Sequence, residues 1–301
     1  MKRGILLYNP TAGQRDRRAA MSALIDRQRR RGLELVNAPT AGPGDATAIV
    51  KSFVARGIDV VAVCGGDGTI SEAACGLEGS SVPLAVLPGG TSNVLAIELG
   101  IPTSLARAEA LLYEGTPHAL RLAHADGRPF LLWAGAGLDA RVMGNLSLPW
   151  KRLLGRAGIF PTALAQFLRY DFPRLEVTVD GVVHAATFAV ACRARHYAGK
   201  WVIAPEARID ADQFEVLLFS HKSRRKLAQL FQLMAAGRAG HLRSGLARIV
   251  RGREVVIRSL DGPVEIQVDG DTVLETPIAC RVGSETVRVL VPKKHPAPKK
   301  K

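Results

Sequence analysis

Three glycines surround one aspartate in the segment Gly65-Gly66-Asp67-Gly68-Thr69, which directly follows an apolar run. Glycine lets backbone N–H groups approach a ligand closely, and the start of a helix adds partial positive charge. Both properties favour a phosphate group as the ligand. The segment has neither the lysine of a Walker A loop nor the Gly-x-Gly-x-x-Gly spacing of a dinucleotide-binding loop. An ordinary turn from a strand into a helix is the alternative interpretation.

The elements that must position this loop alternate between strand and helix. Apolar runs predict strands over residues 4–8, 33–37, 59–64 and 83–87. Helical patterns follow these strands, up to about residue 31, over residues 45–56, from residue 69 and over residues 94–99. Four such alternations indicate a parallel doubly wound α/β sheet, which binds ligands at the carboxyl ends of its strands.

Polar residues gather where these strands end. Asn9 and Thr11 follow the first strand, Thr40 follows the second, and the segment 88–93 follows the fourth. Because the carboxyl ends of parallel strands meet at one edge of a sheet, we expect four loops to converge there. Their glycine, threonine and asparagine residues and their single acid suit contacts to phosphate and ribose groups.

The second half of the chain has the pattern of an antiparallel β domain. Short strands alternate with turn signals up to two last predicted strands, over residues 278–282 and 287–291. Two basic helical regions interrupt them, over residues 150–170, with a break at Pro161, and over residues 223–237. We therefore predict an α/β domain over residues 1–118, a β-sandwich domain over residues 119–292 whose last strand can return to the first domain, and a basic disordered tail over residues 293–301.

The composition fits a globular protein of two domains, because 301 residues exceed what one compact core usually supports. No apolar run approaches the roughly 18–20 residues of a membrane span. The four cysteines form no Cys-x-x-Cys pair. This argues against a zinc site or a disulfide framework and predicts a reducing, cytoplasmic location.

Basic residues are concentrated in the second half of the chain. Residues 1–120 hold 12 Lys and Arg against 11 Asp and Glu, whereas residues 121–301 hold 29 against 16. Much of the excess lies in the segment 221–253, which has no acid, and in the tail. This asymmetry indicates an anionic partner, either nucleic acid or an acidic membrane surface. A solvated basic face with a flexible tail is the alternative.

The motifs together resemble the catalytic domain of the diacylglycerol kinase family, in its bacterial lipid-kinase branch, which is related to sphingosine and ceramide kinases. The resemblance covers nearly the whole chain. Besides the glycine loop, it rests on Asn-Pro-Thr-Ala-Gly at 9–13, Pro-Gly-Gly-Thr-Ser-Asn at 88–93, Ala-Gly-Leu-Asp-Ala at 136–140, Ile-Ala-Pro-Glu-Ala at 203–207 and Val-Asp-Gly-Asp at 268–271. The glycine loop alone also resembles NAD kinases and phosphofructokinases, so the first domain is expected to be similar to theirs.

The resemblance implies that ATP with Mg²⁺ phosphorylates a hydroxyl group of diacylglycerol or a related lipid, a reaction of phospholipid synthesis. Phosphoryl transfer depends on positioning and charge neutralisation. Asp67 is then the acid that faces Mg²⁺, and Asp271 is the candidate general base, where the family has Glu. The alternatives are a helix cap for Asp67 and a solvated hairpin turn for Asp271. The implied nucleotide contacts are Asn9, Thr11, Thr40, Gly65, Gly66, Asp67, Gly68, Thr69, Glu72, Gly90, Thr91 and Asn93.

Three positions depart from the family pattern. Val94 and Arg121 stand where many members have an acid. Ala211 lies at the natural match for the side-chain ligand of a structural Mg²⁺ in the β lobe, although Asp210 or Asp212 could bind that metal after a one-residue shift. A divergent subgroup with a different metal arrangement explains all three departures, and so does loss of activity.

A lipid kinase must reach a bilayer without spanning it, which predicts a cytoplasmic protein bound peripherally to an anionic membrane. Trp150-Lys151-Arg152-Leu153-Leu154 and the basic helix over residues 223–240 could supply this contact. The apolar residues of that helix are expected to pack on the β lobe, namely Leu227, Leu230, Phe231 and Met234.

Other functions remain as alternatives. An NAD-kinase-like enzyme is disfavoured by the long β half, which ends in Asp-Gly-Asp. A nucleic-acid binder would need aromatic residues among its basic ones, and the segment 221–253 offers only Phe231, so no nucleic-acid partner is expected. A catalytically silent binder of nucleotide or anionic lipid is a further alternative. The sequence leaves the oligomeric state open, a homodimer included.

Overall fold

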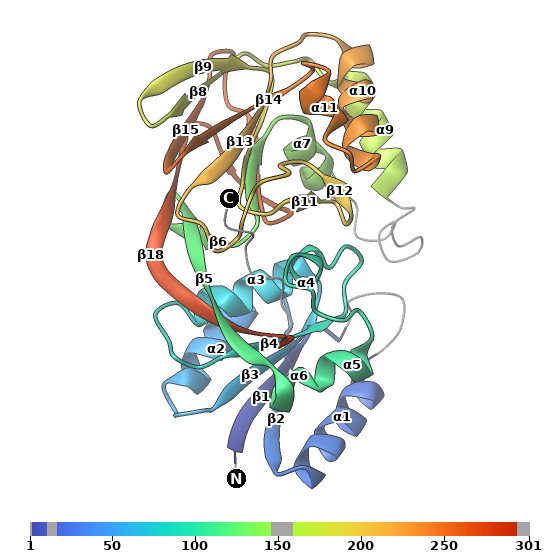
Figure 1. The fold of residues 1–301 in the computed structure, drawn as a ribbon, viewed down its shortest axis with the longest axis vertical. Helices are drawn as coiled ribbons and strands as arrows, with labels where there is room; N and C mark the ends of the chain where they lie inside the picture. Colours follow the sequence, from blue (N-terminus) through green and yellow to red (C-terminus); the bar gives the residue numbers. More distant parts are fainter. Residues whose placement is uncertain (1, 11–16, 146–158, 294–301) are drawn as a thin grey trace. The chain divides into compact units, whose positions relative to one another are not determined.

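A computed structural model of the chain describes residues 2–10, 17–145 and 159–293 (Figure 1). The chain divides into two units, one made of Met1–Leu120 with Glu285–Lys301 and the other of Arg121–Ser284. Two long strands, β5 (Thr116–Ala125) and β18 (Ile278–Val291), contribute residues to both units. Among the described residues, no helix is long and apolar enough to cross a membrane.

The first unit alternates strands and helices along the chain (Figure 1). Its strands are β1 (Lys2–Tyr8), β2 (Leu33–Pro39), β3 (Val60–Gly65) and β4 (Leu84–Pro88). Its helices are α1 (Arg18–Arg30), α2 (Asp45–Val54), α3 (Asp67–Gly76), α4 (Val94–Glu98), α5 (Leu105–Glu109) and α6 (Leu111–Glu114). The apolar runs form strands because helices cover both faces of the sheet.

The four strands lie in the order β2-β1-β3-β4 and pair in parallel. All residues of β3 and β4 are buried. Figure 1 shows α1, α5 and α6 on one side of these strands and α2 and α3 on the other. The strand order reverses between β1 and β3, and ligands of such sheets bind at the carboxyl ends near this point. The predicted parallel doubly wound sheet is confirmed.

The second unit consists mainly of short strands. They are β6 (Arg128–Phe130), β7 (Trp133–Ala136), β8 (Leu175–Val179), β9 (Val182–Ala186), β10 (Phe188–Cys192), β11 (His196–Tyr197), β12 (Trp201–Val202), β13 (Phe214–Phe219), β14 (Arg248–Gly252), β15 (Glu254–Ser259), β16 (Glu265–Val268) and β17 (Asp271–Glu275). Its helices are α7 (Leu138–Gly144), α9 (Ile159–Arg169), α10 (Arg224–Ala235) and α11 (Gly240–Arg243).

Two sheets of this unit share one apolar core. One sheet has the strand order β14-β13-β10-β7-β16-β17, and the other contains β18, β15, β8 and β9 in that order. Neighbouring strands within each pair antiparallel. The rings of Phe130 and Phe214 stack in the core with their centroids 6.1 Å apart. The predicted antiparallel sandwich is confirmed.

Helix α9 begins at Ile159 and has Pro161 in its first turn, where a proline leaves no hydrogen bond unmade. Residues 150–158, the first part of the predicted helical region, lie outside the described residues, so the break at Pro161 stays a prediction. β18 is one continuous strand, whereas the sequence predicts two. Gly283 lies between the two predicted strands, and a Cβ there would come within 2.9 Å of the His124 ring. The glycine therefore lets β18 continue close beside β5.

Candidate active site

The glycine-rich loop starts at the end of β3 and continues into the first turn of α3. Gly65 ends the strand, Gly66 has an extended backbone, and the helix begins at Asp67. A Cβ on Gly65 would lie 2.8 Å from the Cβ of Thr69, so only glycine fits there without a shift. The first N–H groups of a helix have no partner within it, which makes them donors for an anion.

The loop after β4 packs directly against the first one. Gly89 donates its N–H to Gly65 O at 2.9 Å. A Cβ on Gly90 would lie 2.4 Å from Gly66 Cα. Asn93, in the left-handed region with φ 48°, accepts the N–H of Gly90 at 2.8 Å and donates to its carbonyl at 3.0 Å. The two predicted nucleotide loops are thus brought together, and the exposed Thr91 lies within the second.

Asp67 connects the first loop to the helix that follows the second. Its Oδ1 accepts the N–H of Leu95 at 3.2 Å, in the first turn of α4. The side chain is half-buried. This bond holds the carboxylate between the ends of β3 and β4, where the sequence predicts a ligand.

A cation that sequence analysis missed lies at the same edge. Arg17, just before α1, donates from Nη2 to Gly89 O at 2.5 Å and from Nη1 to Cys64 Sγ at 3.5 Å. Its guanidinium therefore contacts the ends of both β3 and β4. The sequence gives no signal for this residue, because Arg15 and Arg18 beside it are equally basic.

Two of the other predicted contacts bond to distant parts of the first unit. Glu72 accepts the N–H groups of Gly44 at 2.9 Å and Ala46 at 3.3 Å, so its carboxylate caps α2. Thr40 is buried and donates its N–H to Tyr8 O at 2.9 Å. Asn9 is half-buried directly after β1. Thr11 lies outside the described residues.

In the second unit, Asp271 begins β17 after a two-residue turn. Asp269 and Gly270 have φ values of 50° and 91°, both in the left-handed region that a type I′ turn requires. The buried Asp269 carboxylate accepts the N–H groups of residues 131–133 at 2.7, 2.7 and 3.1 Å. Asp271 itself is exposed. The turn therefore presents an accessible carboxylate on a firmly held backbone.

A buried network supports this turn. Gln267 Oε1 accepts the N–H of Gly270 at 2.8 Å and Nε1–H of Trp133 at 3.2 Å. Its Nε2 donates to Asp139 at 3.1 Å, and the Tyr197 hydroxyl donates to the same carboxylate oxygen at 3.2 Å. Burial raises the pKa of Asp139 to about 6, although these hydrogen bonds oppose the rise. Sequence analysis missed Gln267, which lies in an apolar strand with no motif of its own.

The two carboxylates predicted as metal ligands are each paired with an arginine. Arg208 contacts both oxygens of Asp210, at 3.0 and 2.9 Å, and Arg253 pairs with Asp212. The described residues contain no group of three or more His, Cys, Asp or Glu side chains that could hold a metal. A divalent cation needs several oxygen ligands without competing positive charge. This loop therefore does not fit a structural Mg²⁺.

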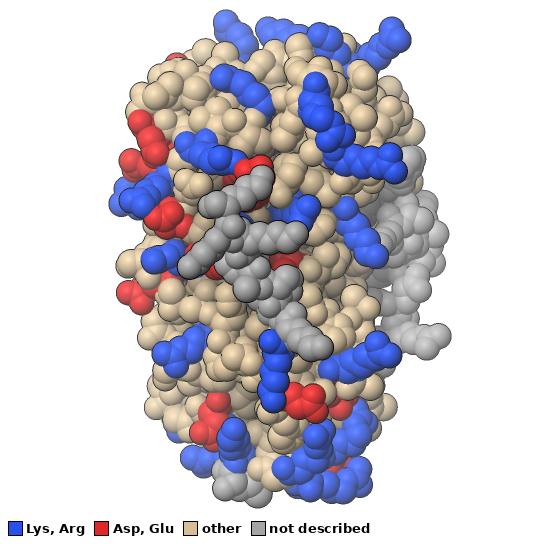
Figure 2. All heavy atoms as spheres, in the orientation of Figure 1, with Lys and Arg blue, Asp and Glu red and all other residues tan. Residues whose placement is uncertain are grey.

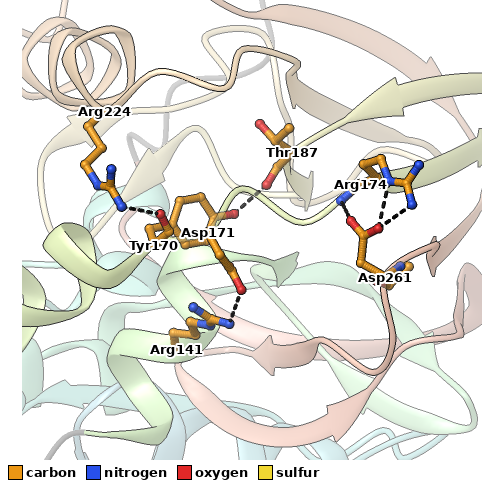
Figure 3. Close-up of polar contacts among 8 residues, drawn as sticks. Arg141, Tyr170, Asp171, Arg174, Thr187, Arg224 and Asp261 are labelled. Atoms are coloured by element: carbon orange, nitrogen blue, oxygen red, sulfur yellow. Dashed lines mark hydrogen bonds and ion pairs between the residues drawn. The ribbon is translucent and has the colours of Figure 1, made fainter.

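A surface pocket of about 280 Å³ lies in the second unit, and Figure 3 shows the two ion pairs beside it. Arg141 of α7 pairs with Asp171 at 3.0 Å, and Arg174 pairs with Asp261 at 2.6 Å. Both acids line the pocket, and the arginines balance their charge. None of the predicted catalytic residues lines it, so we do not assign the reaction to this pocket.

Comparison with protein families matches both halves of the chain. Residues 3–125 match the diacylglycerol kinase catalytic domain. Residues 133–291 match the YegS C-terminal NAD kinase beta sandwich-like domain. The matched ranges include the glycine loops of the first unit and the Asp271 turn of the second.

Individual proteins match over most of their length. A diacylglycerol kinase of Mycobacterium tuberculosis is 27% identical over 297 residues, which cover 95% of this chain and 94% of the relative. A YegS-like lipid kinase of Pseudomonas aeruginosa is 32% identical over 216 residues, 70% of each chain. A crystal structure of a diacylglycerol kinase from Bacillus anthracis has a TM-score of 0.72 at 20% identity and covers 98% of both chains, which shows the same fold.

Proposed function

The chain belongs to the diacylglycerol kinase and YegS family of lipid kinases, and we propose that it transfers the γ-phosphate of ATP to a hydroxyl group of diacylglycerol or a related lipid. Membership in a kinase family implies ATP as the phosphate donor. The observation that carries the proposal is the direct packing of the two glycine loops at the ends of β3 and β4. The relatives named diacylglycerol kinase support a glycerolipid as the acceptor.

The donor is proposed to bind at the carboxyl ends of β3 and β4. Backbone N–H groups of both glycine loops would contact its phosphates, and Arg17 would add positive charge. Mg²⁺ bound with ATP would neutralise charge on the phosphates. Asp67 is the residue that would hold this ion or its water, because Mg²⁺ needs only one or two protein carboxylates beside substrate phosphates.

Asp271 is proposed to be the general base. Its carboxylate would take the proton of the lipid hydroxyl while the hydroxyl oxygen forms a bond to the γ-phosphorus. The bond between that phosphorus and the bridging oxygen breaks, and ADP leaves. The exposed side chain and the bonds that hold the Asp269 turn support this assignment.

A peripheral contact with an anionic membrane follows from a lipid acceptor. Helix α9 exposes Leu164 and Leu168, which are 51% and 59% exposed and lie one turn apart. Helix α10 exposes three cations in its first turn, namely Arg224, Arg225 and Lys226. Figure 2 shows Lys and Arg side chains gathered at the end of the second unit where Figure 1 shows α10. Apolar side chains beside positive charge suit binding to anionic lipid.

The apolar face of α10 is not part of this contact. Leu227, Leu230 and Met234 are buried, and the Phe231 ring packs on Phe188 with centroids 5.9 Å apart. The expectation that these residues pack on the β unit is confirmed. The segment 150–154, also predicted to touch the membrane, lies outside the described residues.

Transfer of labelled γ-phosphate from Mg²⁺-ATP in mixed micelles tests the proposed reaction. The acceptors are diacylglycerol, monoacylglycerol, ceramide and sphingosine, with NAD as the water-soluble comparison. We expect label in a glycerolipid. Label in NAD alone would contradict the proposal and indicate a small-molecule kinase. No label in any acceptor, with ATP still bound, would indicate a catalytically silent binder.

A further inference from the structure

Arg193, which follows β10, is a fully buried arginine in the second unit. Its side chain is 0% exposed. Its Nη2 donates to the carbonyl of Ile209, while Nε and Nη1 have no hydrogen-bond partner in the described part of the chain. Burying a guanidinium with unmade hydrogen bonds costs free energy unless nearby negative charge offsets that cost.

Three acids offset part of that cost. Burial, together with the positive charge of Arg121, lowers the pKa of Arg193 to about 10, whereas Asp210, Asp269 and Asp212 raise it. The side chain therefore stays charged at neutral pH. Arg193 is also linked to one of these acids, Asp269, through the backbone, because its N–H donates to Leu132 O at 2.8 Å. Asp269 in turn accepts the N–H of Leu132 at 2.7 Å.

The carbonyl that accepts the bond from the Arg193 side chain, Ile209 O, belongs to the loop over residues 208–212. The family resemblance predicts a structural Mg²⁺ in this loop, and its residues do not fit that ion. In this loop Ala211 has no ligand atom on its side chain. The acids on either side of it pair with Arg208 and Arg253. The loop is therefore a cluster of carboxylates and carbonyls that receives its positive charge from arginines.

We propose that the guanidinium of Arg193 is the built-in cation of this loop and takes the place of a bound divalent ion. The second unit then folds and holds the Asp269 turn without metal, and a requirement for Mg²⁺ is confined to the nucleotide. This inference concerns a structural ion and is independent of the lipid that is phosphorylated.

Thermal unfolding of the full chain without nucleotide tests the proposal. The melting temperature of the wild type should change by no more than about 1 °C between excess EDTA and excess MgCl₂ or CaCl₂, because linkage stabilises only a protein that binds the ion. A drop in EDTA that Mg²⁺ or Ca²⁺ reverses would overturn the proposal. So would one divalent ion per chain retained after purification and detected by elemental analysis.

Substitution of the arginine gives the complementary test. Arg193→Met should lower the melting temperature by roughly 5–10 °C, because it leaves the buried Ile209 carbonyl without its donor and removes a buried positive charge near the carboxylates. Arg193→Lys, which keeps the charge, should lower it less. Arg195→Met removes an exposed arginine two residues away and is the matched control. Equal melting temperatures for Arg193→Met and Arg195→Met would contradict the proposal. If Arg193→Met does not fold, the lysine variant and the wild-type metal titration decide.

A paired substitution separates the roles of the arginine and the metal. Arg193→Met with Ala211→Asp removes the built-in cation and adds a carboxylate, so its melting temperature should rise with Ca²⁺ or Mg²⁺. Ala211→Asp alone should show no such rise, because Arg193 still supplies the positive charge. A rise of equal size in the single variant, or none in the double variant, would contradict the assignment.

Discussion

At the scale of single residues, Arg17 is the positive charge that joins the ends of β3 and β4. It contacts Gly89 O, in the second of the two loops that are proposed to hold the phosphates, and Cys64 Sγ, directly before the first. Arginine recognises phosphate through charge-assisted hydrogen bonds. A guanidinium in this position can stabilise charge on the transferred phosphoryl group without a Walker A lysine.

Arg17→Met should therefore weaken ATP binding and lower kcat/KM for ATP by about 10–100-fold, the loss expected for one charged hydrogen bond. Arg17→Lys should retain part of the activity. Arg18→Met, at an exposed position on α1, is the control. Steady-state kinetics and titration with ATP and adenosine check the prediction. An Arg17→Met variant with wild-type affinity for ATP would exclude a phosphate contact.

We expect Asp139 to make the stability of the second unit depend on pH. Its pKa is raised from 3.8 to about 6, so the folded protein holds this proton more tightly than the unfolded chain does. The resulting stabilisation is present below about pH 4 and is lost as the pH rises through 6. The difference between the two pKa values corresponds to about 3 kcal/mol.

Asp139→Asn cannot ionise and should lack this pH dependence. Between pH 4 and pH 7 the free energy of unfolding of the wild type should fall, relative to that of the variant, by about 2–3 kcal/mol. Urea unfolding at several pH values measures the difference between the two proteins. Parallel pH profiles for both would show that Asp139 does not titrate from a raised pKa.

At the scale of elements, sequence periodicity predicted the strands and loops of the first unit well. Continuous apolar runs that end in glycine mark buried parallel strands, and β3 and β4 are such runs. Periodicity could not predict which hydrogen-bond partners long side chains have. Glu72 was expected to contact nucleotide, but its carboxylate caps α2, a contact between residues 26 and 28 positions apart in the chain. Its role as a nucleotide contact stays a prediction.

The exposed face of α9 gives a prediction about membrane binding. Leu164→Glu combined with Leu168→Glu should lower affinity for vesicles containing phosphatidylserine by about tenfold or more, because two apolar contacts are replaced by negative charge. Val182→Glu with Val183→Glu is the control, since these residues of β9 are 59% and 58% exposed. Vesicle sedimentation measures the binding. Equal losses in the two double variants would indicate a general charge effect and not a docking surface.

At the scale of the whole molecule, the fold class could be predicted from the sequence. The hydrogen-bond network that supports the turn before Asp271, the candidate base, could not. The alternation of strands and helices, followed by closely spaced turns, is a local pattern that does not depend on how the elements pack together. The network of Asp139, Gln267 and Tyr197 joins residues up to 128 positions apart, and no local pattern encodes it. The same is true of the contact between Arg193 and Ile209.

The most direct test of the proposed reaction is phosphoryl transfer to diacylglycerol by Asp271→Ala beside the wild type. Glu275→Ala, at an exposed acid near the end of the same strand, is the matched control. We predict a loss of at least about 100-fold in kcat for Asp271→Ala, with ATP affinity unchanged, because only the general base is removed. If Asp271→Ala transfers phosphate as fast as Glu275→Ala does, the assignment of the base is contradicted. If the wild type transfers no phosphate, the proposed reaction itself is contradicted.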